Sequence, residues 1–396
     1  MPATSSAIEG LHRCVAPASQ AFTIPPAWYV DDELFAEETN AVFRRGWVGV
    51  GRAERWPKAG AYAAIEIGGV PVVIGRGDDG RLRAFANSCR HRASQIMVGE
   101  GTCARFRCPF HFWTYALDGR LIGAPSMQQT PGFDAAEHGL IDFPVAESHG
   151  FAFVSVDPDP PVFATWLGDF GAHHAPWPLA ELRMARRREL VVDCNWKAFA
   201  EVFNEYYHLP YVHPDSIDEN YLEPDEPESS SGAYATQFGR TQGSGGLLDD
   251  DRHLQFPIIA GLPERERTGV RYTWLFPNVV FAAGADALWM YEVYPDGPHR
   301  CNVAQTVCFP ESTMSLPEFT ARAEHYYERF DVALDEDIPA LTQQHAGLQS
   351  PFAEQGRFSY LEPSVASFAA WYAQRVLRVH PAAPATPDLL GAPSRG

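Results

Sequence analysis

The sequence contains no long hydrophobic run and few basic residues for its length. No stretch of its 396 residues approaches the roughly 18 apolar residues that a membrane span needs, so we expect no membrane segment. Lys and Arg number 31 against 50 Asp and Glu, which gives a net charge of −19. This charge argues against nucleic acid as a partner, because phosphate binding needs a basic surface. The N-terminus also lacks the features of a signal peptide, and we expect a cytoplasmic protein.

Cysteine is scarce as well. Seven cysteines are too few and too scattered for a disulfide scaffold. An odd number fits free thiols, with a subset binding a metal. They are Cys14, Cys89, Cys103, Cys108, Cys194, Cys301 and Cys308.

Composition and turn residues divide the sequence into four segments. Short β-rich stretches separated by Gly-Gly and Asp-Gly turns predict a small all-β domain, with strands at 47–50, 62–67, 70–74 and 82–86. The proline-rich run at 157–161 marks its end. The predicted segments are an N-terminal arm packing on the C-terminal domain (1–44), the all-β domain (45–157), the C-terminal domain (158–380) and a flexible tail (381–396).

The C-terminal domain is predicted to be α+β, with a cavity between an antiparallel sheet and helices. Asn195 can cap a helix that runs to about residue 209. Residues 218–251 are acidic and rich in Ser and Gly, which predicts a long mobile loop or a lid. The predicted strands are 189–194, 270–276, 279–283, 288–294 and 301–309, and the later helices are 318–345 and 364–379.

Two Cys/His pairs lie in the all-β domain. Cys89 and His91 form a C-x-H pair, and Cys108 and His111 form a C-x-x-H pair after a gap of 16 residues. Two thiolates and two imidazoles are the ligands of a Rieske [2Fe–2S] cluster. A structural zinc site is the alternative, although zinc fingers usually pair Cys with Cys and His with His.

A second metal site is predicted near the middle of the chain. His208 and His213 lie close in sequence, and Pro210 is expected to break the helix so that both can reach one metal. Two His and one carboxylate form the triad that holds Fe(II) for oxygen activation. We expect Asp337 to supply the carboxylate, with Asp335 as the alternative; a solvated acidic helix face is the simpler interpretation of this acidic run.

Glu205 is expected to have a different role. One helical turn before His208, its carboxylate can hydrogen-bond the metal-bound imidazole. We therefore predict that Glu205 links His208 to a cluster histidine (His91 or His111) and carries electron transfer. A surface glutamate is the alternative.

With these residues in place, the chain resembles the catalytic α subunit of Rieske non-haem iron oxygenases. The resemblance rests on the two Cys/His pairs, the Asn195-Trp196-Lys197 run, Glu205 with its two following histidines, and Asp337. It departs from many members at Phe112, where Gly is common. Many ring-hydroxylating members have Asp where Glu205 stands, and Glu is similar to the quaternary-ammonium branch.

The resemblance implies a Rieske domain and a helix-grip catalytic domain with mononuclear Fe(II) and O2 as co-substrate. It also implies a head-to-tail homotrimer in which the cluster of one subunit serves the iron of its neighbour through Glu205. An NAD(P)H-dependent reductase, in some members with a ferredoxin, supplies electrons.

Three functions follow from these features. The first is hydroxylation or oxidative N-demethylation of a small quaternary-ammonium or amine compound. Trp289 and Tyr291 share one strand face and can cup an ammonium group, although core packing is the commoner role for such residues. The second is hydroxylation or dioxygenation of an aromatic acid or related ring, which a buried Arg or Lys in the pocket would favour. The third is an electron carrier with an inactive second domain.

Overall fold

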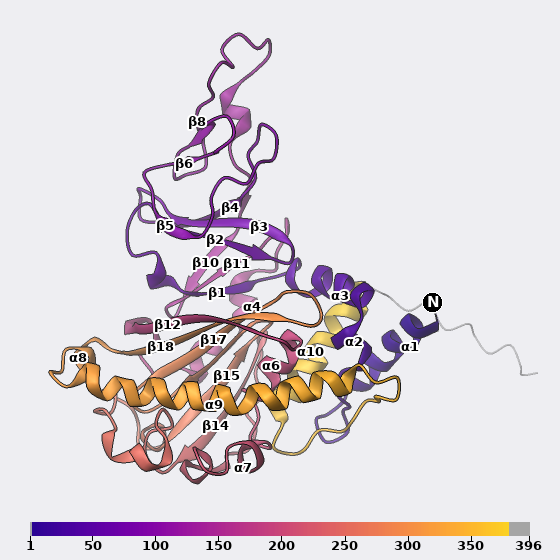
Figure 1. Cartoon of the computed structure of the whole chain (residues 1–396), viewed down its shortest axis with the longest axis vertical. Coiled ribbons are helices and arrows are strands. Elements are labelled where there is room, and N and C mark those ends of the chain that lie inside the picture. Colours follow the sequence, from indigo (N-terminus) through magenta and orange to yellow (C-terminus); the bar gives the residue numbers. More distant parts are fainter. Residues whose placement is uncertain (1, 380–396) are drawn as a thin grey trace, which may run out of the picture.

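The computed structural model describes residues 2–379, and the predicted tail 381–396 lies outside the described residues. Small sheets form a β-rich part toward one end of the long axis, and a larger sheet with long helices forms the other part (Figure 1). This arrangement confirms the predicted α+β class. No described helix is both long enough and apolar enough to cross a bilayer.

Each described α-helix lies either before residue 39 or after residue 162. Most belong to the C-terminal part, and the N-terminal ones lie beside it (Figure 1). The α-helices are α1 (Pro2–Leu11), α2 (Ala27–Val30), α3 (Asp32–Glu38), α4 (Phe163–Leu167), α5 (Phe170–His173), α6 (Trp196–Val202), α7 (Leu209–Val212), α8 (Glu311–Met314), α9 (Phe319–Leu348) and α10 (Pro363–Val379).

The β-rich part consists of three small antiparallel sheets that include all four predicted strands. Their strand orders are β1-β11-β10, β5-β2-β3-β4-β9 and β6-β7-β8. The strands are β1 (Val48–Arg52), β2 (Ala61–Ile67), β3 (Val70–Arg76), β4 (Leu82–Ala86), β5 (Glu100–Thr102), β6 (Phe106–Arg107), β7 (Thr114–Tyr115), β8 (Leu121–Gly123), β9 (Asp142–Phe143), β10 (Val145–Ser148) and β11 (Phe151–Val154).

The C-terminal part is built on one seven-stranded antiparallel sheet. Its order is β12-β18-β17-β16-β15-β14-β13. The strands are β12 (Leu182–Val192), β13 (Tyr221–Pro224), β14 (Tyr234–Thr241), β15 (Gly269–Leu275), β16 (Val279–Ala283), β17 (Leu288–Pro295) and β18 (Cys301–Pro310).

The two faces of this sheet contact different partners. On one face, Tyr291 packs against Phe199 of α6 at 5.5 Å between ring centroids, and α9 crosses the same face (Figure 1). On the other face, Phe281 packs against Phe151 of β11 at 5.1 Å. The sheet is therefore buried on both sides, and the helices α6 and α9 enclose one face of it.

The prediction of a mobile acidic loop at 218–251 is wrong. This segment contains β13 and β14, and β14 pairs with β15 along its length. Several of its acids have partners: Glu228 lies 3.0 Å from the buried guanidinium of Arg271, and Asp225 lies 2.8 Å from Arg265. These acids form ion pairs with arginines of a neighbouring strand and loop, and the sequence of the segment itself does not show these partners.

Glu38 anchors the N-terminal helices on the C-terminal part. Its buried carboxylate accepts hydrogen bonds from Trp196 Nε1 and Tyr372 Oη, both at 2.6 Å, and pairs with the Lys197 ammonium. A buried charge is tolerated when its partners are present, and loss of one partner would be costly. Trp196 and Lys197 therefore hold the start of α6 against the N-terminal helices through Glu38.

Candidate active site and metal centres

Helix α6 ends before it reaches the predicted iron ligands. Asn195 caps its start as predicted, because Oδ1 accepts a first-turn backbone amide at 3.0 Å. The predicted continuation to residue 209 is wrong, since α6 ends at Val202. Just beyond, the side chain of Asn204 turns back and donates from Nδ2 to the Ala200 carbonyl at 2.8 Å.

Pro210 does not break a helix, because it is the second residue of the short helix α7. It lies in the first turn of α7, where its missing amide hydrogen costs nothing. His208 stands at the start of this short helix and His213 at its end. One turn of helix therefore sets the spacing of the two imidazoles, whose ring centroids are 5.1 Å apart.

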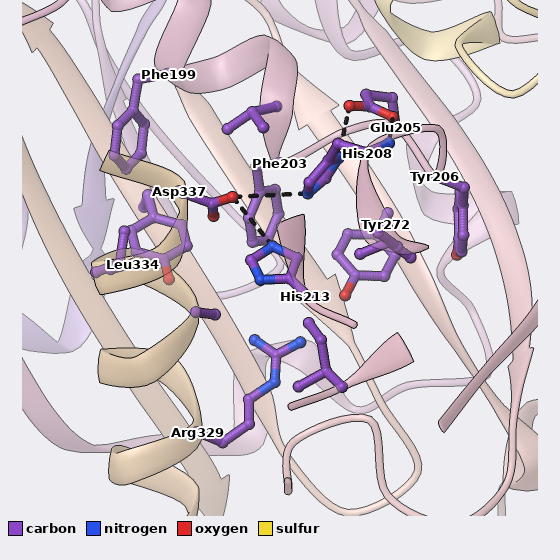
Figure 2. Close-up of a pocket in the computed structure, with 15 residues that line it drawn as sticks. Phe199, Phe203, Glu205, Tyr206, His208, His213, Tyr272, Arg329, Leu334 and Asp337 are labelled. Atoms are coloured by element: carbon purple, nitrogen blue, oxygen red, sulfur yellow. Dashed lines mark hydrogen bonds and ion pairs between the residues drawn. The ribbon is translucent and has the colours of Figure 1, made fainter. Parts of the chain in front are cut away.

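Asp337 faces both histidines from α9 (Figure 2). Its Oδ1 atom lies 3.0 Å from Nε2 of His213 and 3.7 Å from Nε2 of His208. One ligand atom from each of the three residues lies within 4.8 Å of the others. Asp335, the alternative ligand, is exposed on the same helix. The structure thus assembles two imidazoles and one carboxylate, the donor set of a facial Fe(II) site.

Carboxylates hold the far side of each imidazole. Glu205 Oε1 lies 2.6 Å from Nδ1 of His208, and Glu336 Oε2 lies 2.7 Å from Nδ1 of His213. Ser216 donates from Oγ to the same Glu336 oxygen at 2.7 Å. A carboxylate accepts the Nδ1 proton, so the lone pair of each histidine is left on Nε2, the atom that faces Asp337.

This set of atoms suits a cation. In the neutral histidines, both Nε2 lone pairs point toward Asp337 Oδ1, an oxygen that is buried and has no hydrogen-bond donor among the described residues. Burial opposes protonation of His208, but the hydrogen bond and charge of Glu205 outweigh it and raise the pKa of His208. The site therefore attracts positive charge, and a divalent iron fits between its three acceptors.

A pocket with aromatic walls opens beside these residues (Figure 2). Four of its rings form what we call the aromatic wall: Phe199, Phe203, Tyr272 and Tyr291. Neighbouring rings meet edge to face at centroid distances of 5.1 to 5.5 Å. The cavity volume is about 50 Å³. The guanidinium of Arg329 lies at one end of the pocket.

The two predicted substrate residues lie differently. Tyr291 lines the pocket. Trp289 shares its strand face, as predicted, but packs behind the pocket, with its ring 5.1 Å from that of Phe330. It is not among the lining residues, because the α9 side chains Phe330 and Arg329 cover it.

The two predicted cluster loops lie together in the β-rich part. The loop of Cys89 and His91 precedes β5, and that of Cys108 and His111 joins β6 to β7. The two imidazole rings are 4.8 Å apart between centroids, and both thiols are buried. Trp113 stacks on the His91 ring at 5.0 Å and shields it from solvent.

These loops also fit a cluster electronically. His91 Nδ1 is buried without a hydrogen-bond partner among the described residues. Burial opposes ionisation of Cys108, but a backbone amide at Phe110 and the Cys89 thiol outweigh it and lower the pKa of Cys108. Phe112 has a positive φ of 59°, which explains why Gly is common there in the family the chain resembles. Two thiols and two imidazoles match a [2Fe–2S] centre with mixed ligands.

Two residues of the site, Glu336 and Arg329, are not identified by the sequence reasoning above. Glu336 is one acid in the run 335–337, and Arg329 belongs to no motif. A signal for Arg329 exists, because it precedes Asp337 by eight residues and Ala333 by four. This spacing places all three on one face of a helix.

The chain matches two known protein families. Residues 179–378 match the family described as ring hydroxylating alpha subunit (catalytic domain), and residues 46–134 match the Rieske [2Fe-2S] domain. The second match decides against the structural zinc alternative.

Full-length relatives support the same grouping. The chain is 27% identical over 387 residues to the glycine betaine monooxygenase oxygenase subunit of Chromohalobacter salexigens, covering 90% of this chain and 86% of the relative. It is 26% identical over 376 residues to the chloroplastic choline monooxygenase of Spinacia oleracea, covering 90% and 79%.

Solved structures share the fold. The quaternary ammonium Rieske monooxygenase CntA with gamma-butyrobetaine superposes with a TM-score of 0.75 at 23% identity, covering 92% of this chain and 98% of that one. Naphthalene 1,2-dioxygenase from Rhodococcus sp. gives 0.76 at 20% identity, covering 96% and 100%. The chain therefore belongs to the ring-hydroxylating alpha subunits, oxidoreductases that join a Rieske [2Fe–2S] domain to a catalytic domain using mononuclear iron and O2 and take electrons from a separate reductase.

Proposed function

We propose that this protein is a monooxygenase that removes an N-methyl group from a small quaternary-ammonium compound. The observation that carries the proposal is the aromatic wall beside His208, His213 and Asp337. Faces of aromatic rings attract quaternary ammonium groups by cation–π interaction. Relatives named for glycine betaine and choline support this substrate class.

We assign the metal-binding residues as follows. His208, His213 and Asp337 hold Fe(II), and Cys89, His91, Cys108 and His111 hold the [2Fe–2S] cluster. When bound, the iron supplies activation of O2, and the cluster supplies single electrons to it. Glu205 and Glu336 keep the Nδ1 protons of the two histidines in place, so that each Nε2 stays available.

The pocket residues position the substrate and exclude water. The aromatic wall holds the methylated nitrogen beside the open side of the histidine pair, and Leu334 and Ile217 close the pocket with apolar surface. The overall reaction consumes O2, two electrons and two protons; one oxygen atom converts an N-methyl group to N-hydroxymethyl, and the other becomes water. The C–N bond of the N-hydroxymethyl group then breaks: the carbon leaves as formaldehyde, the hydroxyl proton is released to solvent, and the nitrogen keeps the bond electrons and becomes a tertiary amine.

We further propose a head-to-tail homotrimer. The cluster loop between β6 and β7 and the helix α7 lie toward opposite ends of one chain (Figure 1), too far apart for a direct contact. Exposed aromatics surround each of the two ends: Phe110 and Phe112 at the cluster, Tyr207 and Tyr211 beside Glu205. Docking one end on the other in a neighbouring subunit would bring a cluster histidine to Glu205. An NAD(P)H-dependent reductase, directly or through a ferredoxin, would supply the electrons.

The test is product analysis with a surrogate reductase. We expect glycine betaine or a similar N-methylated compound to give formaldehyde and the demethylated amine, one of each per O2 consumed. A panel in which only aromatic compounds are oxidised, or in which O2 uptake never responds to an N-methyl compound, would contradict the proposal.

Hydroxylation of an aromatic acid is the second candidate. The observation that favours it is Arg329, a buried cation in the pocket that can bind a carboxylate. Hydroxylated benzoate in the same panel would establish it. The electron-carrier alternative has less support, because the three iron-binding side chains and their two supporting carboxylates are all assembled.

A further inference from the structure

Arg329 is a buried cation whose guanidinium reaches into the active-site pocket (Figure 2). Its residue surface is only 4% exposed. Nη2 donates to the hydroxyl of Tyr221 at 3.2 Å, and the guanidinium carbon lies 5.4 Å from the Trp289 ring centroid and 5.1 Å from that of Phe330. These contacts hold the side chain in place, but none of them supplies a negative charge.

The other buried arginines of the described chain have carboxylate partners. Arg271 is paired with Glu228 at 3.0 Å, and Arg52 lies 3.9 Å from Glu54. For Arg329, no Asp or Glu among the described residues forms an ion pair, and its Nε is buried without any partner. Burying a charge without a counter-charge is costly, so such a residue is retained where something else supplies the anion.

Two of the hydroxyls near Arg329 already donate their protons to other oxygens. Tyr221 Oη donates to the Gly245 carbonyl at 3.0 Å, and it accepts from Arg329 Nη2 and from Tyr272 Oη. Tyr291 Oη accepts from Gln305 Nε2 at 3.3 Å, which leaves its own proton without a partner among the described residues. Burial raises the pKa of Tyr291 to about 12, so it keeps that proton. Arg329 and the Tyr291 hydroxyl line the same pocket, and both can donate to an anion bound there.

We infer that Arg329 binds a carboxylate of the substrate, so that the enzyme selects N-methylated zwitterions over N-methylated alcohols. The inference rests on the proposed function for the ammonium end of the ligand. Arg329 and Asp337 are eight residues apart on α9, about 12 Å along the helix axis. The aromatic wall lines the same pocket as both residues. A compact betaine would place its carboxylate on Arg329 and direct a methyl group toward the histidine pair.

The test uses four ligands of nearly equal shape on the metal-loaded enzyme, measured by calorimetry without O2. Glycine betaine carries both charges, and choline carries the ammonium with an alcohol in place of the carboxylate. 3,3-Dimethylbutanoate carries the carboxylate on an uncharged tert-butyl group, and 3,3-dimethylbutan-1-ol carries neither charge. The two charges are thereby varied independently.

Three variants accompany the four ligands. Arg329→Met removes the charge, and Arg329→Lys keeps it. Arg322→Met is the matched control, because Arg322 lies on the same helix but donates to the Leu254 carbonyl outside the pocket. Hydrogen bonds to charged groups contribute enough that Arg329→Met should weaken both carboxylates by about 10- to 100-fold. Choline and the neutral alcohol should change by less than about 3-fold, Arg329→Lys should restore part of the carboxylate affinity, and Arg322→Met should resemble the wild type.

Equal weakening of all four ligands by Arg329→Met, or no weakening of the carboxylates, would overturn the inference. If that variant does not fold, the wild-type enzyme still decides, because glycine betaine no tighter than choline would contradict a carboxylate site. A failure of the proposed function would give a different result. In that case dimethylbutanoate would bind as tightly as glycine betaine, which would support the carboxylate site but show that the pocket does not prefer an ammonium group.

Discussion

Glu336 Oε2 lies 2.7 Å from Nδ1 of His213, and Ser216 donates to the same carboxylate oxygen. Glu336 precedes Asp337 in sequence, so α9 supplies both the proposed ligand and the group that orients another ligand. Glu205 has the same relationship to His208 at 2.6 Å. Each histidine is thus held at Nδ1 by a carboxylate, His208 by Glu205 and His213 by Glu336.

Glu336→Ala should weaken iron binding by about 10- to 100-fold, because His213 loses the acceptor that fixes its ring and tautomer. Glu336→Gln should have a smaller effect, since its amide oxygen can still accept the Nδ1 proton. Competition with a chelator, followed by iron analysis, measures the affinity. Asp335→Ala, at the exposed neighbouring acid, is the control; equal affinities for Glu336→Ala and the control would contradict the assignment.

Glu205→Gln should keep both metal centres and abolish turnover, by at least about 100-fold. The amide can still accept from His208 Nδ1, so the iron should remain, but the carboxylate that we propose as the link between subunits is gone. Iron content, the cluster spectrum and the rate of cluster reoxidation with substrate and O2 together measure this. A fully active variant would show that the bridge is wrong even if the iron site stands.

His174 should make stability depend on pH. Burial lowers its pKa from 6.5 to about 3, while Nδ1 donates to the Phe170 carbonyl and Nε2 accepts from Thr273, both at 2.8 Å. The unfolded chain takes up a proton below pH 6.5 and the folded chain does not. The contribution of neutral His174 to the free energy of unfolding should therefore be present well above pH 6.5 and should fall by about 2 kcal/mol between pH 7.5 and 5.0.

His174→Gln is the comparison for that prediction. Glutamine keeps a donor and an acceptor but does not titrate, so the decline over the same pH interval should be smaller by about 2 kcal/mol. Urea unfolding at pH 7.5 and 5.0 measures both proteins. Parallel declines in the two proteins would mean that other groups cause the acid sensitivity.

Features set by short sequence spacing were predictable. The two Cys/His pairs identify their loops, because each pair sits within one tight turn. The choice of Asp337 over Asp335 depends on which face of α9 meets the sheet; Asp337 points toward the two histidines, whereas Asp335 is exposed.

Features set by tertiary contacts were harder to predict. Pro210 suits both the end of a helix and its first turn. The sequence does not show that α6 already ends at Val202, so that Pro210 belongs to the next helix. Residues 218–251 have the composition of a loop, but Asp225 and Glu228 form ion pairs with arginines outside the segment, and two strands form within it. Arg329 is an ordinary helix arginine in the sequence, and only burial beside the pocket distinguishes it.

The most direct test of the account is the iron and acid-labile sulfide content of the wild type and Asp337→Ala, measured together with substrate-dependent O2 uptake. We predict about three irons and two sulfides per wild-type chain. The variant should hold about two irons with an unchanged [2Fe–2S] spectrum, and it should consume no O2 with glycine betaine or any related compound. A variant that keeps the third iron and oxidises substrate at the wild-type rate would contradict the account.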